Sequence, residues 1–167
     1  TIYELVEVII HFLPCFALPR TELVTKLATF SSLPPDEAMI EASKLSQSAR
    51  DLFIKAHKAT QRTGEAGEFL LSILTEWVLQ APQLIAKMSL KTSRAMPVHG
   101  SDGIHGRFSA AHKTLTLFWG ESKVHADVKQ AIRDAIESIV EANKPEKQQH
   151  EIKLVARYID FAGLDDT

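Results

Sequence analysis

The stretch VHGSDGIHGRFSAAHKTLTLFWGESK, residues 98–123, decides the arrangement of the rest of the chain. Its pattern predicts two strands joined by a hairpin, with Asp102 at the end of the first strand and Glu121 and Lys123 at the end of the second. Successive strand residues point to opposite faces, so Glu121 and Lys123 share a face. Pairing of the two strands then brings two carboxylates and one ammonium group into a small volume.

An alternating segment before this stretch extends the sheet to a three-stranded antiparallel meander. The strands are expected at residues 84–91, 98–105 and 113–123, and residues 106–113 form the hairpin connection. Periodic apolar residues predict helices on both sides of the meander. The predicted class is therefore mixed α/β, with helices packed on the faces of a small sheet.

The helices are predicted from apolar spacing and from capping residues. They are expected at residues 2–13, ending at Pro14, and at 21–30, 34–61, 65–78 and 128–142. The last segment is ambiguous, because residues 145–162 fit a helix that ends at Gly163 while residues 153–161 also fit a strand; the helix is favoured. We divide the chain into an N-terminal helical region, residues 1–60, packed on a core formed by residues 61–167.

The acidic pair and the lysine suit a divalent metal ion and a phosphodiester. Asp102 and Glu121 offer the oxygen ligands that Mg²⁺ prefers, and the backbone carbonyl of Ser122 could add another. A metal held there would polarise a phosphodiester and lower the pKa of a bound water. Lys123 could orient that water or offset the charge that develops on the phosphate. The residues thus outline a site for phosphodiester hydrolysis.

The Glu-x-Lys triplet is by itself a weak signal, because such triplets commonly lie on solvated faces. Its position raises its significance. Apolar residues of the same parity precede it in the strand: Leu115, Leu117 and Trp119. The pair therefore extends an apolar face, where charges are rarely placed without a purpose. At this point the alternative, a strand that simply emerges into solvent at Glu121 and Lys123, stays open.

Composition is that of a water-soluble globular chain. The 167 residues are 45% hydrophobic and 24% charged, with a formal net charge of −2. A free-standing nucleic-acid binder is more often basic, so contacts to phosphate must come from a local patch. The candidates for that patch, which we do not rank, are Lys87, Lys91, Arg94, Arg107 and Lys113.

Cysteine usage and hydropathy favour a cytoplasmic location. Cys15 is the single cysteine, so no disulfide can form within the chain, and a reducing compartment fits. The longest apolar run, near residues 8–18, is interrupted by His11 and Pro14 and is too short for a membrane span. It also lacks the basic start of a signal peptide.

The order of these elements resembles the PD-(D/E)XK nuclease superfamily, which has a restriction-endonuclease-like core. The resemblance is carried by an acidic helix, a strand with Asp102, a strand that ends in Glu121-Ser122-Lys123, and a following helix. More specifically, the sequence resembles the HamA family, the nuclease subunits of Hachiman anti-phage defence systems. The segments that carry this similarity are GEAGEFLL (64–71), KMSLKT (87–92), HGSDGIH (99–105) and LFWGESKVH (117–125).

The resemblance implies a function and a set of partners. It implies Mg²⁺-dependent cleavage of DNA, with Mn²⁺ as a possible substitute metal, in complex with a HamB-like helicase. It places Asp102 and Glu121 on the metal and Lys123 beside the attacking water. A glutamate from the preceding helix often joins such sites, and Glu68 is the position that fits. The family core continues with a further strand, so either the core is truncated at its C-terminus or residues 153–161 form that strand.

Two alternatives differ in class from a magnesium nuclease. The first is a Zn²⁺ or Mn²⁺ site that uses histidine, because His99 and His105 flank Asp102 and His125 follows Lys123. The spacing matches no familiar histidine motif, and a contact to phosphate or support of the site suits His105 or His125 better. The second is a catalytically silent nuclease fold that serves as a docking or DNA-binding module in a helicase complex.

Overall fold

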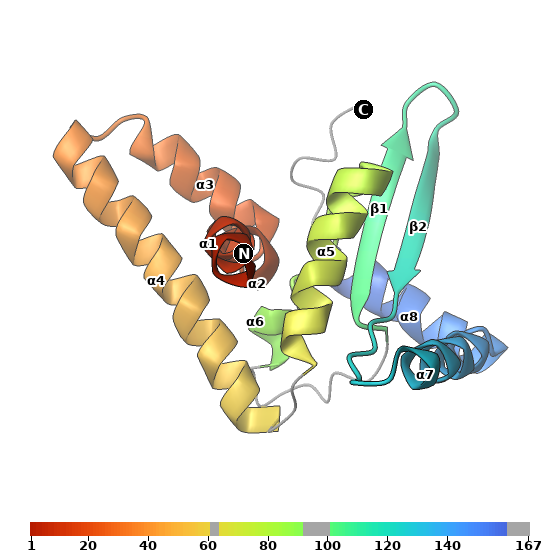
Figure 1. The fold of residues 1–167 in the computed structure, drawn as a ribbon. Helices are drawn as coiled ribbons and strands as arrows, with labels where there is room; N and C mark the ends of the chain where they lie inside the picture. Colours follow the sequence, from red (N-terminus) through yellow and green to blue (C-terminus); the bar gives the residue numbers. More distant parts are fainter. Residues whose placement is uncertain (61–63, 92–100, 160–167) are drawn as a thin grey trace.

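The structure is a computed structural model that describes residues 1–60, 64–91 and 101–159. Its helices before the hairpin are α1 (Ile2–Ile9), η1 (Ile10–Phe12), α2 (Leu13–Ala17), α3 (Arg20–Phe30), α4 (Pro35–Thr60), α5 (Glu65–Leu79) and α6 (Lys87–Lys91). The hairpin and the last helices are β1 (Gly103–Ser109), β2 (Thr114–Gly120), α7 (Val128–Ala142) and α8 (Pro145–Tyr158). Figure 1 shows α5 between the N-terminal helices and the hairpin, with α7 at the end of the strands.

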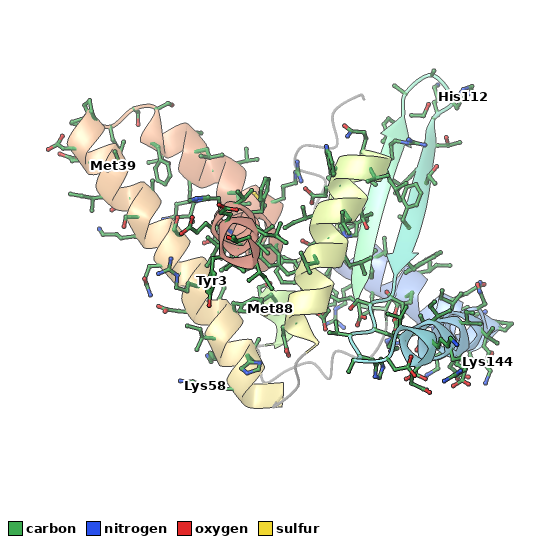
Figure 2. All side chains as sticks on the ribbon, viewed as in Figure 1. Tyr3, Met39, Lys58, Met88, His112 and Lys144 are labelled. Atoms are coloured by element: carbon green, nitrogen blue, oxygen red, sulfur yellow. The ribbon has the colours of Figure 1, made fainter. Side chains whose placement is uncertain are left out.

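The N-terminal helix does not stop at Pro14 as predicted. The chain passes from α1 through the short 3₁₀ helix into α2, and Pro14 lies in the first turn of α2. A proline is tolerated there because the first turn has no partner for the missing N–H. The expected buried face of residues 2–13 is also wrong for α1, which buries none of its residues. Tyr3, labelled in Figure 2, is largely exposed.

Helices α3, α4 and α5 are confirmed, and a cluster of phenylalanines joins two of them to α2. Phe16 of α2 lies 5.1 Å from Phe69 of α5 between ring centroids, and Phe53 of α4 lies 6.2 Å from Phe69. Met88 of α6 is buried in the same cluster (Figure 2). The division at residues 60 and 61 stays a prediction, since this cluster draws on both sides of it.

The described part of the sheet has two strands, so the predicted three-stranded meander is wrong in its first strand. β1 and β2 pair antiparallel from Gly103↔Gly120 to Ser109↔Thr114. The segment expected as a strand over 84–91 instead ends in helix α6.

The start of that first segment still runs along the free edge of β1. The Leu84 N–H donates to the Ile104 carbonyl at 2.9 Å, and the Gly106 N–H donates to the Pro82 carbonyl at 3.0 Å. Leu84 and Ile85 are both buried although they are consecutive. That burial does not alternate as it does in a strand with one solvent face, and the chain turns into a helix instead.

The first strand of the hairpin continues further toward the hairpin turn than predicted, so the connection between the strands is shorter. β1 begins at Gly103 and continues to Ser109, so residues expected in the connection over 106–113 belong to the strand. β2 ends at Gly120, which leaves Asp102, Glu121 and Lys123 just beyond the last paired residues. Residues 98–100 of the expected 98–105 strand lie outside the described residues.

The C-terminal segment is the helix that we favoured. α8 runs to Tyr158 and is capped by Ile159, so the alternative strand does not form over residues 153–159; residues 160–161 of that strand, and Gly163, lie outside the described residues. Val155 of α8 packs with Leu84 and Ile104 in a second buried cluster beneath the hairpin. α7 is also confirmed, but it turns its isoleucines to solvent.

Within the described ranges, no single helix is long and apolar enough to cross a bilayer. One bent pair, residues 2–17 with 20–30, has the length and composition for it only when the two are taken together.

The buried histidine of β1 predicts a dependence of stability on pH. His105 Nδ1 lies 2.9 Å from the Ala81 carbonyl, and Nε2 has no hydrogen-bond partner among the described residues. Burial lowers the pKa of His105 below its ordinary value of 6.5. The unfolded chain therefore takes up this proton more readily than the folded chain, and the free energy of unfolding falls as the pH drops below about 6.5.

A histidine-to-asparagine variant tests this expectation. His105→Asn keeps a side-chain N–H near the position of Nδ1 but cannot titrate. It should cost about 1–3 kcal/mol at pH 7 because a buried ring is truncated. Its loss of stability between pH 7 and pH 5, measured by urea unfolding, should be smaller than that of the parent. His112→Asn, in the exposed hairpin turn, is the control, and an equal pH slope in parent and His105→Asn would contradict the assignment.

Candidate active site

The ends of the two strands bring the predicted residues to one place. Gly103 pairs with Gly120, so Asp102 and Glu121 are the next residues beyond the last pair. The Asp102 N–H donates to the Gly120 carbonyl at 2.9 Å and continues the ladder by one bond. The predicted meeting of Asp102 with the Glu-x-Lys turn is therefore consistent with the strand register.

The Asp102 carboxylate accepts hydrogen bonds from Ser122, the middle residue of the Glu-Ser-Lys turn (residues 121–123). Its Oδ2 accepts the Ser122 N–H at 2.7 Å and the Ser122 Oγ hydroxyl at 3.0 Å. Hydrogen bonds to a carboxylate are stronger than neutral ones, so this pair of bonds fixes the turn relative to β1. Ser122 acts here through its amide and hydroxyl, while its carbonyl as a metal ligand stays a prediction.

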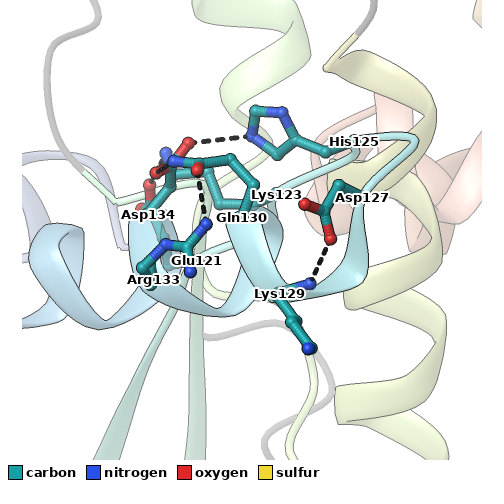
Figure 3. A network of polar contacts seen from close by, with 8 residues as sticks. All are labelled: Glu121, Lys123, His125, Asp127, Lys129, Gln130, Arg133 and Asp134. Carbon is teal, nitrogen blue, oxygen red and sulfur yellow. Dashed lines mark hydrogen bonds and ion pairs between the residues drawn. The ribbon is translucent and has the colours of Figure 1, made fainter.

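Glu121 and Lys123 form an ion pair within the turn. Lys123 Nζ lies 2.5 Å from Glu121 Oε1, and the two side chains are 28% and 18% exposed. The hydrogen bond that Lys123 donates to Glu121 raises the pKa of Lys123, and the charges of Glu121, Asp102 and Asp134 raise it further. The charges of these carboxylates thus favour the cationic form of Lys123; Glu121 and Asp134 are drawn beside it in Figure 3.

Helix α7 begins at Val128, after the linking residues 124–127, and two of these residues are bonded to it by polar contacts. His125 Nε2 lies 3.0 Å from Asp134 Oδ2, and Asp127 caps the helix by accepting the Lys129 N–H at 2.8 Å (Figure 3). Gln130 Nε2 donates to the other oxygen of Asp134 at 2.5 Å. His125 therefore supports the start of α7 and, in this arrangement, is paired with a carboxylate.

The first turn of α5 lies directly against the Glu-Ser-Lys turn. A side chain at Gly67 would meet Val124 Cγ2 at 2.7 Å and Ser122 Oγ at 3.1 Å, so only a glycine allows this approach. Glu68 is partly buried and follows Gly67, so its backbone lies near the site. Its part in the site stays a prediction. Glu65, by contrast, is buried with Oε2 at 3.6 Å from His57 Nδ1.

An open cleft of about 630 Å³ lies beside the ion pair. Its walls come from the end of the hairpin and from α7 and α8, and the lining residues are Ser101, Glu121, Lys123, Asp134, Glu137, Ser138, Glu141, Ala142, Lys147 and Glu151. Carboxylates outnumber ammonium groups in this wall by five to two. Such a wall attracts cations and repels a bare phosphate.

The donor set fits a loosely held hard cation and not a closed protein cage. Asp102 and Glu121 would supply the one or two carboxylates with which Mg²⁺ is usually bound, the remaining ligands being water and substrate. Within the described ranges no group of three or more His, Cys, Asp or Glu residues is placed to hold a metal. His105 is buried inside β1 against Ala81, and His99 lies outside the described residues, so the histidine-metal alternative gains no support.

Of the basic residues predicted to contact phosphate, Lys87 instead binds a backbone group inside the protein. Lys87 is buried, and its Nζ donates to the Ser101 carbonyl. Arg107 is exposed on β1, with a long hydrogen bond of 3.4 Å from its guanidinium to the Leu79 carbonyl. Lys113 lies in the hairpin turn, at the opposite end of the strands from Asp102. Arg94 and the Lys91 side chain lie outside the description.

Sequence reasoning missed Glu151, whose carboxylate binds the residue before Asp102. Its Oε1 accepts the Ser101 N–H at 2.9 Å and its Oε2 accepts the Ser101 hydroxyl at 3.3 Å. The available signal was its spacing: Glu151 precedes the buried Val155 by one helical turn, so a charge occupies the buried face of α8. A charge at such a position needs a partner.

The raised pKa of Lys123 gives a direct test of this geometry. Glu121→Gln should lower the pKa of Lys123 most, because it removes the charged hydrogen-bond acceptor. Asp102→Asn should lower it less, since Asp102 acts through charge alone. The measurement is a carbon-detected NMR titration of the lysine side chain. Asp127→Asn is the control and should change nothing; equal effects of Glu121→Gln and Asp127→Asn would contradict the ion pair.

Comparison with known proteins gave one result. The family model described as HamA matches residues 2–167, essentially the whole chain, and this family is associated with Hachiman anti-phage defence. Curated proteins and solved structures gave no match. On the extent of the family match, this chain belongs to the HamA family.

Proposed function

We propose that this chain is a metal-dependent DNA endonuclease that acts as the effector of an anti-phage defence complex with a HamB-like helicase. The observation that carries the proposal is the position of Asp102, Glu121 and Lys123 at the shared end of two paired strands, in a chain of the HamA family. The choice of DNA and of a helicase partner rests on the family resemblance.

The residues divide the chemistry between them. Asp102 and Glu121, with the Ser122 carbonyl, would hold Mg²⁺ or Mn²⁺, which supplies polarisation of the phosphodiester and a water of lowered pKa. Lys123 is kept cationic by its neighbours, so it can orient the attacking water and offset the negative charge of the transition state. Glu68, from the first turns of α5, is proposed to join the site and accept a proton or support a metal-bound water.

The charge around the site suggests how DNA reaches it. Five carboxylates, Glu121 among them, line the cleft, and the chain carries a net charge of −2. Phosphate would be repelled from this wall unless a divalent cation offsets it or another protein presents the strand. A helicase that delivers DNA to the site fits this need and is the partner that we propose.

A catalytically silent docking module is the second candidate. The ammonium of Lys123 already satisfies Glu121 Oε1, and Ser122 already satisfies Asp102 Oδ2. Carboxylates that are already hydrogen-bonded without a metal are also what a purely structural turn would show. In an enzyme, a metal would have to replace some of these hydrogen bonds at Glu121 or Asp102. The two candidates therefore differ in a measurable property, metal-dependent cleavage.

The test is cleavage of supercoiled plasmid by the purified protein in the presence of Mg²⁺ or Mn²⁺, alone and with its helicase partner. The parent should nick DNA, and EDTA should abolish nicking. Glu121→Ala and Lys123→Ala should each lose about a hundredfold or more in rate, because each removes a group that acts on the developing charge.

Glu137→Ala is the matched control, since Glu137 lines the same cleft from α7 but belongs to no proposed ligand set. It should retain activity. Equal nicking by the parent and by both site variants would assign the activity to another site or to a contaminant. A parent that stays inactive with its helicase present would favour the docking module.

A further inference from the structure

Ser101, the residue before Asp102, has both its backbone N–H and its carbonyl hydrogen-bonded to charged side chains. The Ser101 N–H donates to Glu151 of α8 at 2.9 Å, and the Ser101 carbonyl accepts from Lys87 Nζ of α6. The Ser101 hydroxyl adds a third bond, at 3.3 Å to the other oxygen of Glu151. Two helices from distant parts of the sequence, α6 and α8, therefore meet at one residue.

All three residues are removed from solvent, with exposed fractions of 8% for Ser101, 6% for Glu151 and 4% for Lys87. Burial of a charged group is costly unless hydrogen bonds and opposite charges compensate for it. Here the negative and positive groups take the donor and the acceptor of the same residue. Because one buried side chain binds the N–H of Ser101 and the other binds its carbonyl, the arrangement holds Ser101 in one position.

Ser101 is connected directly to the candidate site. Asp102 is the next residue, and its carboxylate carries the hydrogen bonds to Ser122 at 2.7 and 3.0 Å. A displacement of Ser101 would move Asp102 and loosen the Glu-Ser-Lys turn. Glu151 lines the same cleft as Glu121, but both of its oxygens are engaged by Ser101. This geometry suits a group that positions another residue better than it suits a metal ligand.

We propose that Glu151 and Lys87 are positioning residues that clamp Ser101 and thereby fix Asp102 against the Glu-Ser-Lys turn. Their effect on catalysis rests on the proposed function, in which Asp102 binds the metal. Their effect on the turn does not, and it can be measured without any cleavage. α8 contributes in this way to the site although it lies outside the strands that carry it.

The first measurement is amide hydrogen exchange, resolved by NMR, in the parent, Glu151→Ala and Glu151→Gln. Glu151→Ala should speed exchange of the Ser101 amide and also of the Ser122 amide about tenfold or more, although Glu151 does not touch Ser122. The Gly106 amide, which is bonded to Pro82 in the middle of β1, should be unaffected. Glu151→Gln retains an oxygen acceptor for the Ser101 N–H and should lie between the two.

The second measurement is the Mg²⁺ concentration that gives half-maximal plasmid cleavage by the protein with its helicase. Glu151→Ala should raise it about tenfold or more, as is found when residues that orient metal ligands are removed. Excess Mg²⁺ should restore most of the rate. Glu146→Ala, at the exposed start of α8, is the matched control and should behave as the parent in both measurements.

The outcomes separate this proposal from the proposed nuclease. An unchanged exchange rate of the Ser122 amide in Glu151→Ala would overturn the proposal that Glu151 positions Ser101. An equal increase in the exchange rate of the Gly106 amide would also overturn it, because it would mean general destabilisation. Faster exchange at Ser122 with an unchanged Mg²⁺ requirement would overturn its role in catalysis. If Glu151→Ala does not fold, the same criteria apply to Glu151→Gln. A parent that cleaves nothing refutes the nuclease, while the exchange data still decide the clamp.

Discussion

The antiparallel pairing of β1 with β2 is the constraint on which the rest of the structure depends. It ends at Gly103 and Gly120, and one further backbone bond, from Asp102 to Gly120, sets the acidic residue beside the Glu-Ser-Lys turn. Every other element near the site secures this end of the hairpin. α5 approaches it through Gly67, α7 starts from it, and α8 reaches it through Glu151.

The polar contacts at this end are arranged in series. Lys87 and Glu151 hold Ser101, Asp102 holds Ser122, and Glu121 holds Lys123. Each link joins an ionised group to a backbone group or to an opposite charge, which is the form in which buried charges are tolerated. These bonds place the charged groups without a ligand, and preorganised placement of charged groups is what electrostatic catalysis requires.

Much of this arrangement could be predicted from sequence because it is local. Alternation and a short polar break indicated the hairpin, and strand pairing then brought Asp102 to the Glu-x-Lys turn. The predicted strand over 84–91 was wrong because the apolar alternation there does not correspond to one buried face. The consecutive residues Leu84 and Ile85 are both buried, and the chain then forms the short helix α6. Glu151 and Lys87 were missed because hydrogen bonds from buried charged side chains to the Ser101 backbone join residues far apart in sequence, which no local pattern records.

The central claim is that Asp102 and Glu121 act together on one divalent cation. The most direct measurement is a calorimetric titration of the protein with Mn²⁺, repeated for Asp102→Asn, for Glu121→Gln and for a Glu137→Gln control. Our account predicts one site in the parent and in the control, and its loss in both Asp102→Asn and Glu121→Gln. Undiminished Mn²⁺ binding in those two variants would contradict it, because the cation would then be held by other residues.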